Sequence, residues 1–152
     1  MALLTNENIR LRALEPEDLE LIFRWENDTS LWAMGNTLSP YSRYTIKEYI
    51  QDSRQHDIYE LRQLRLMIEI VATEDVIGMI DLYDFEPYHK RAGVGILIDL
   101  AYRNKGYATN ALNLLLDYTF SFLKIHQLYV HIPEKNQSSR SLFKYCGFVE
   151  KG

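Results

Sequence analysis

The stretch over residues 91–108 most constrains the fold, because it joins a strand, a short turn and the start of a helix. Its apolar run, residues 94–98, predicts a buried strand. A polar turn then leads to Gly106 and a long helix, whose first turn leaves backbone N–H groups unpaired and carries the positive end of the helix dipole. The junction therefore predicts an anion site, which Gly106 leaves open to a phosphate and to which Arg103 and Lys105 add positive charge.

Alternating apolar and polar residues predict further strands over residues 9–13, 64–70 and 76–85. Short turns join the last two of these to the strand at 94–98, which indicates an antiparallel meander. A helix separates that strand from another short one at 128–132. Those two strands should therefore run parallel, joined by a right-handed crossover.

Helical signals lie between the predicted strands. Pro16 with acidic neighbours predicts one helix that ends near residue 28. The capping-box spacing of Thr45 and Glu48 predicts a second helix that runs to about His56. Apolar spacing predicts helices over 106–123, packed on the sheet, and over 138–146.

Composition fits one soluble domain over residues 1–152, because 47% of the residues are hydrophobic and 25% are charged. The net charge of −4 argues against nucleic-acid binding by phosphate neutralisation. No apolar stretch approaches the roughly 20 residues of a membrane span. The single cysteine, Cys146, indicates a reducing, cytoplasmic setting. No metal is expected, since the histidines lack ligand spacing.

Two motifs carry a resemblance to a known family. Residues 103–108, RNKGYA, resemble the R/Q-x-x-G-x-G/A pyrophosphate loop of the GNAT family of N-acetyltransferases. Residues 136–148, NQSSRSLFKYCGF, resemble that family's N-x-x-S-x-x-L-(Y/F)-x-x-x-G-F segment. Two separated motifs in the family's order are more specific than either one alone. The resemblance runs over residues 9–149 and points to the branch of ribosomal-protein N-terminal acetyltransferases and spermidine/spermine acetyltransferases.

The resemblance implies an α+β fold of the GNAT type. It has a mixed, mostly antiparallel sheet, helices on both faces, and one parallel strand pair that splays to bind acetyl-CoA. The backbone of Ile96, Leu97 and Ile98 would pair with the pantetheine. The pyrophosphate would lie on backbone N–H groups of the loop, which comprises Arg103, Asn104, Lys105, Gly106, Tyr107 and Ala108, and next to the hydroxyl of Thr109. Asn136 would reach the pantetheine, and Phe143 belongs to the same implied site.

The implied reaction is direct attack of an amine on the acetyl thioester. An alkyl ammonium group has a pKa of about 10.4, so a group near the acceptor must take up a proton. Acidic residues that could do so are Glu26 and, on the predicted central strands, Glu69, Asp81 and Asp84, of which Asp81 and Glu69 are the catalytic candidates. Asp81 and Asp84 are three apart, so they point to opposite faces unless a bulge intervenes.

The proton donor for the leaving thiolate departs from the family pattern, because many family members place a tyrosine at the position of Phe143. Phenylalanine has no proton to give. Ser139 lies four residues before Phe143 and shares its helix face. The donor is therefore Ser139, a bound water or bulk solvent.

The amine acceptor has two candidate classes. The rim sequence TSLWAMGNTLSPYSR, residues 29–43, contains no acid, whereas the spermidine-acetylating branch uses this stretch in an acidic polyamine site. Its composition favours a protein N-terminus of the ribosomal type. A polyamine is the alternative, because residues 77–148 resemble the spermidine branch. A non-catalytic acyl-CoA sensor is a third hypothesis, motivated by Phe143.

The end of the chain predicts one more feature of the sheet. Phe148 and Val149 read as the start of a strand, and the family's last strand does not follow. An open sheet edge would then need a cover, such as a partner in a homo-oligomer.

Overall fold

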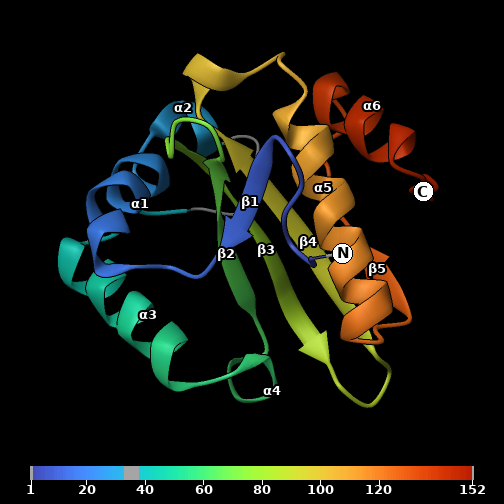
Figure 1. Cartoon of the computed structure of the whole chain (residues 1–152), viewed down its shortest axis with the longest axis horizontal. Helices are drawn as coiled ribbons and strands as arrows, with labels where there is room; N and C mark the ends of the chain where they lie inside the picture. Colours follow the sequence, from blue (N-terminus) through green and yellow to red (C-terminus); the bar gives the residue numbers. More distant parts are fainter. Residues whose placement is uncertain (1, 33–37, 152) are drawn as a thin grey trace.

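The computed structural model describes residues 2–32 and 38–151. Within these ranges five strands form one mixed sheet in the order β1-β2-β3-β4-β5, and helices cover both of its faces (Figure 1). The strands are β1 (Ile9–Arg12), β2 (Leu64–Ile70), β3 (Val76–Glu86), β4 (Arg91–Ile98) and β5 (Gln127–Tyr129). The α-helices are α1 (Leu19–Glu26), α2 (Thr29–Trp32), α3 (Arg43–Gln55), α4 (Ile58–Leu61), α5 (Tyr107–Asp117) and α6 (Gln137–Tyr145). The predicted fold class is confirmed.

The sheet pairs tightly on one side of β4 and only briefly on the other. Strands β1 to β4 are antiparallel neighbours, and β3 pairs with β4 along most of its length. β5 is parallel to β4 and pairs with it only through Arg91–Gln127, Ala92–Leu128 and Gly93–Tyr129. Beyond Gly93 the two strands separate. For this reason β5 ends at Tyr129, and the strand predicted over 128–132 is shorter than expected.

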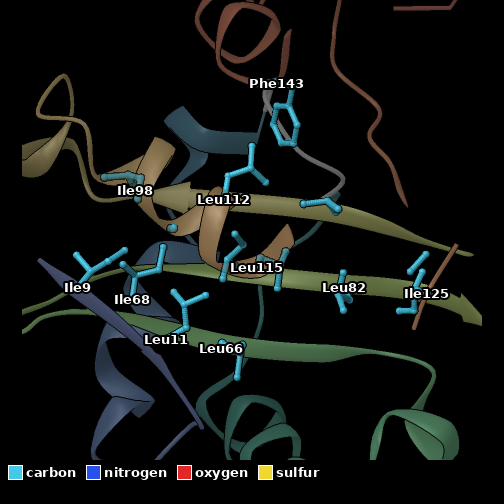
Figure 2. Packing of buried hydrophobic residues seen from close by; sticks show 14 of the residues in the cluster. Ile9, Leu11, Leu66, Ile68, Leu82, Ile98, Leu112, Leu115, Ile125 and Phe143 are labelled. Carbon is cyan, nitrogen blue, oxygen red and sulfur yellow. The ribbon is translucent and has the colours of Figure 1, made fainter. Parts of the chain in front are cut away.

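The main core lies between the sheet and α5 (Figure 2). Leu112 and Leu115 of α5 are three apart, so they lie on one face of the helix and pack on buried strand residues such as Ile80 and Leu82. Full burial of each such side chain stabilises the fold by about 1.5–3 kcal/mol. Phe143 of α6 belongs to the same cluster.

A second core lies on the opposite face, under α1 and α3. Ile22 and Trp25 of α1 pack there with Met67 and Met79 of the sheet. The indole Nε1 of Trp25 also donates a hydrogen bond to the carboxylate of Asp99, at 2.9 Å. That bond fixes α1 to the turn that follows β4.

The observed helix boundaries agree with some of the predicted ones and differ from others. Pro16 begins a 3-10 turn that leads into α1, as predicted. The capping box predicted at Thr45 is wrong: Ser42 caps α3, and its Oγ accepts a hydrogen bond from the Thr45 N–H at 3.0 Å. The helix after Gly106 ends as a π-helix over Tyr118–Phe122.

Other predictions concern the segments between elements. Within the acid-free stretch 29–43, α2 forms over Thr29–Trp32, and residues 33–37 lie outside the described residues. Phe148 and Val149 form no strand in the described chain, and Phe148 instead packs edge-on against Phe143. No helix of the described ranges is long and apolar enough to cross a membrane.

Candidate functional site

A cleft opens where β4 and β5 separate. It has a volume of about 1890 Å³ and is lined by the free edge of β4, the start of α5, the residues after β5, and α6. Side chains of α1, β2 and β3 line its other side. Because β5 leaves β4 after Gly93, the β4 backbone from Val94 to Ile98 has no strand partner on this edge. An extended chain with amide groups could pair with it there.

The loop before α5 has the geometry of an anion site. Gly106 is the N-cap of α5 at φ +85°, and Asn104 has φ +61°. A Cβ at Gly106 would meet nothing within 4 Å, so the loop surface is open at this point. The guanidinium Nε of Arg103 donates to the Ile98 carbonyl at 3.1 Å, which ties the loop to the end of β4. Unpaired N–H groups at the start of α5 therefore face an unobstructed approach.

The structure brings nearly all the residues predicted to hold acetyl-CoA to this cleft. Lys105 alone among them does not line it, and its ammonium lies 5.9 Å from the Tyr102 ring centroid. The predicted residues that line the cleft are Ile96, Leu97, Ile98, Arg103, Asn104, Gly106, Tyr107, Ala108, Thr109, Asn136 and Phe143.

The α6 residues of the predicted site have structural contacts of their own. The Asn136 Oδ1 accepts a hydrogen bond from the Ser139 N–H at 3.1 Å and so caps α6. Ser139 is half-buried and lines the cleft. Phe143 is 3% exposed and packs edge-on against Phe148, with ring centroids 5.0 Å apart. α6 therefore contributes a serine hydroxyl and an apolar wall to the cleft.

Two carboxylates share one arginine on the opposite wall. Arg65 of β2 binds Asp81 of β3 through two hydrogen bonds, Nε to Oδ1 at 2.8 Å and the second terminal nitrogen to Oδ2 at 2.9 Å. Its other terminal nitrogen lies 3.4 Å from Oε1 of Glu26, at the end of α1. The three side chains are 14–25% exposed. This cluster holds two negative charges against one positive charge at the edge of the cleft.

Burial changes the proton affinity of this cluster. It raises the pKa of Glu26 above its ordinary value, and Arg65 only partly opposes that shift. Burial alone would lower the pKa of Arg65, but the charges of Asp81 and Glu26 outweigh it, so the pKa of Arg65 is raised. Glu26 is therefore a carboxylate that takes up a proton more readily than usual, beside an arginine that stays charged.

Glu69 and Asp84 lie elsewhere. Glu69 is buried but pairs with Arg10 at 2.6 Å and with Arg12 at 2.9 Å, and it does not line the cleft. Asp84 is exposed at the bulge near the end of β3, at φ +49°, and also does not line the cleft. Of the predicted acids, the structure brings Asp81 and Glu26 to the cleft.

Sequence reasoning missed two residues of this wall, Arg65 and Tyr83. Tyr83 lies two residues after Asp81 on β3, so the alternation of the strand was a signal that both face the same side. A smaller pocket of about 280 Å³ continues the wall between α1, α3 and β2 and shares Glu26 and Arg65 with the cleft. Burial raises the pKa of Tyr49, which lines that pocket, to about 12.

A family model and the sequences of characterised proteins both match this chain to acetyltransferases. Residues 8–149 match the family described as acetyltransferase (GNAT) domain. A spermidine N(1)-acetyltransferase of Vibrio cholerae is 31% identical over 147 residues, which cover 97% of this chain and 82% of that protein.

Solved structures agree with the sequence match. The crystal structure of spermidine N-acetyltransferase from Vibrio cholerae in complex with CoA and spermine superposes with a TM-score of 0.82 at 30% identity, over 97% of this chain and 84% of that one. A dodecameric structure of the enzyme from the same organism gives a TM-score of 0.75 at 31% identity, over 97% and 82% of the two chains.

Proposed function

The chain belongs to the GNAT acetyltransferase family, and on that premise we propose that it transfers the acetyl group of acetyl-CoA to a primary amine of a polyamine. The observation that carries this proposal is the carboxylate pair, Glu26 and Asp81, on the cleft wall opposite the phosphate loop. The relatives named above are spermidine acetyltransferases, and one was crystallised with CoA and spermine. They favour the polyamine alternative over the protein N-terminus that the composition of residues 29–43 suggested.

Acetyl-CoA would lie along the free edge of β4. Its pantetheine amides would pair with the backbone of 96–98, and its pyrophosphate would accept hydrogen bonds from N–H groups of the loop around Gly106. Thr109 and Asn136 line the same region and could donate to the phosphates and the pantetheine. The residues that would hold the substrate are thus mainly backbone groups of one continuous strand, turn and helix.

The chemistry requires a neutral amine. At neutral pH nearly every polyamine nitrogen is protonated, since its pKa is about 10.4. The carboxylate of Asp81, held by Arg65, would attract the cation to the wall. Glu26 would accept the amine proton, directly or through a water, because its raised pKa suits a general base. The amine nitrogen would then bond to the acetyl carbon as the carbon–sulfur bond breaks.

Release of the CoA thiol tests the proposal. We would measure it with spermidine, spermine and short peptides that have free Ser, Ala or Met N-termini. Turnover with the polyamines and not with the peptides is expected. Turnover with peptides alone would return the acceptor to the ribosomal type, and CoA binding without turnover on any amine would favour the sensor hypothesis.

A homo-oligomer accompanies this proposal. Among the described strands β5 has a partner only on its β4 side, so its other edge can accept a further strand. The Vibrio cholerae relative forms a dodecamer. Light scattering on the purified chain should therefore give a mass that is a multiple of 17.9 kDa. A mass equal to that of one chain would count against the assembly.

A further inference from the structure

Acetyl transfer needs a proton for the leaving sulfur, and the side chain at position 143 cannot supply it. Phe143 is buried in the core and has no ionisable proton. A thiolate leaves more readily when a neighbouring O–H donates to it. A side chain that assists in this way would lie where the thioester sits, which is at the closed end of the gap between β4 and β5.

The closed end of that gap is at Gly93. A pantetheine that follows β4 from the loop end at Ile98 back to Val94 covers about 13 Å, at a rise of about 3.3 Å per residue. Past that point β5 pairs with β4 through Gly93 and Tyr129, and an inserted chain can go no further. The thioester would therefore lie beside Gly93 and Val94.

Tyr83 occupies that point. Tyr83 and Gly93 are opposite each other in the β3–β4 ladder. A Cβ built on Gly93 would lie 2.4 Å from Cε2 and Cζ of the Tyr83 ring and 2.9 Å from its hydroxyl oxygen. The ring thus lies directly over Gly93, in the space that a larger residue would fill, and Tyr83 lines the cleft.

From this geometry we infer that Tyr83 is a catalytic residue that donates its hydroxyl proton to the departing thiolate of CoA, in place of the tyrosine that many family members carry at the position of Phe143. The inference rests on the proposed function, since it assumes that acetyl-CoA binds between β4 and β5. It assigns a role to a residue that neither motif contains.

The proton balance closes within the cleft. Glu26 first takes a proton from the ammonium group and releases it to solvent. The neutral amine nitrogen then bonds to the acetyl carbon and gives a second proton to Glu26. The electron pair of the broken carbon–sulfur bond goes to sulfur, which takes the hydroxyl proton of Tyr83. The tyrosinate regains a proton from solvent, to which Glu26 releases its own. The products are the N-acetyl amine and the CoA thiol.

Neighbouring groups keep Tyr83 protonated. Burial raises the pKa of Tyr83, and the nearby Tyr129, Asp84 and Asp81 raise it further. Tyr129 lies edge-on to Tyr83, with ring centroids 6.2 Å apart, and the Arg91 guanidinium covers the Tyr129 ring at 4.8 Å. Ser139 is a weaker candidate donor, because a phenol, with an ordinary pKa of about 10, is far closer than an aliphatic hydroxyl to a thiol of about 8.5.

The decisive experiment compares Tyr83→Phe with the wild-type protein in two measurements. The first is the pKa of the bound CoA thiol, followed by the ultraviolet absorbance of its thiolate. Loss of a hydrogen bond to a charged sulfur should raise that pKa by about one unit. The second is kcat against pH with the preferred amine. We expect kcat to fall by about tenfold to a hundredfold and its decline at alkaline pH to disappear.

Tyr129→Phe and Ser139→Ala serve as matched controls, and each should leave the thiol pKa unchanged. An unshifted thiol pKa in Tyr83→Phe, or a shift caused by either control instead, would overturn this inference alone. If CoA does not bind the wild-type protein, both the proposed function and the inference fail. The first measurement needs no acceptor, so an unexpected amine does not affect it.

Discussion

The proposed cofactor side of the cleft is made mainly of backbone, whereas the proposed acceptor side is made of side chains from distant parts of the chain. The cofactor side is one continuous segment, β4 and the loop that leads into α5. The acceptor side joins Glu26 from α1, Arg65 from β2, and Asp81 and Tyr83 from β3. The two sides therefore depend on different physical properties of the chain.

Backbone groups tolerate many side chains as long as the local dihedral angles hold. The loop thus depends on a few positions such as Gly106, at φ +85°. The acceptor side depends instead on charge balance, because Arg65 compensates both Asp81 and Glu26 in a partly buried place. A change on one side should leave the other side working, and the following variants test that separation.

Replacement of Arg65 by Met should have the largest effect. It leaves two carboxylates without a cation, and we expect the free energy of unfolding to fall by about 3 kcal/mol, measured by urea denaturation at pH 7. Arg43→Met removes an exposed ion pair with Glu20 and a cation–π contact with the Phe23 ring at 4.0 Å, and it should cost no more than about 1 kcal/mol. Under conditions in which Arg65→Met is folded, its affinity for CoA should equal that of the wild type. A parallel loss of CoA affinity would show that the two sides are coupled.

Glu26→Gln should lower kcat by about 100-fold, because the amide cannot accept the amine proton. In the wild type, kcat should fall as the pH drops through the pKa of Glu26, which burial raises above its ordinary value. The variant should lack that acidic decline. Its KM for acetyl-CoA should not change.

Glu26→Gln should lose activity but gain folding stability relative to the wild type as the pH rises. The folded protein favours protonated Glu26, so this group stabilises it fully below the unfolded-state pKa, and that contribution is lost as the pH rises through the raised folded-state pKa. Glu26→Gln should therefore gain stability relative to wild type over that rise. Glu69→Gln is the control. It should lose stability, because Arg10 loses its ion pair with Glu69 and Arg12 keeps only its pair with Asp18, and it should keep kcat. A large loss of kcat in Glu69→Gln would restore the catalytic role predicted for Glu69.

Gly106→Ala should weaken acetyl-CoA binding by about tenfold, because a left-handed non-glycine residue costs about 1–2 kcal/mol and the loop would leave this conformation. Gly147→Ala is the matched control: Gly147 lines the cleft beyond the end of α6 and outside the loop, and it also has a positive φ, +101°, with nothing within 4 Å of its Cβ position. Both variants should lose similar stability in thermal unfolding, but only the first should lose affinity in calorimetry. Equal affinity losses would contradict a specific role for the loop backbone.

The contrast between one continuous segment and side chains from distant segments also explains which parts of the fold and of the site the sequence predicts. The strands β2 and β3 follow from local alternation and β4 from its apolar run. The loop motif places all its residues except Lys105 on the cleft, because they are adjacent in the chain. The length of β5 was overestimated, because pairing with β4 is a tertiary property. The start of α3 was misplaced, because Ser42 and Thr45 both have cap-forming side chains and only the structure shows which one caps.

The acceptor side was harder to predict for a physical reason. Glu69 and Asp81 are both acidic residues on the predicted central strands, and in the sequence they look equivalent. Strand register separates them, because Arg10 lies opposite Glu69 in the β1–β2 pair, whereas Arg65 lies opposite Asp81 in the β2–β3 pair. Glu69 is thereby enclosed by arginines, and Asp81 stays at the cleft. No local pattern encodes which arginine meets which acid.

Lys105→Ala should have the smallest effect and makes the comparison sharper. The side chain is exposed and does not line the cleft, so its charge would act on the phosphates only at long range. We expect KM for acetyl-CoA to rise about two- to threefold at about 0.05 M salt and to match the wild type at about 0.5 M salt, where exposed charges are screened. Lys47→Ala, on the exposed face of α3, should change KM at neither salt concentration. An increase that persists at high salt would mean that Lys105 contacts the phosphates directly, and the cofactor side would then depend on a side chain as well as on backbone.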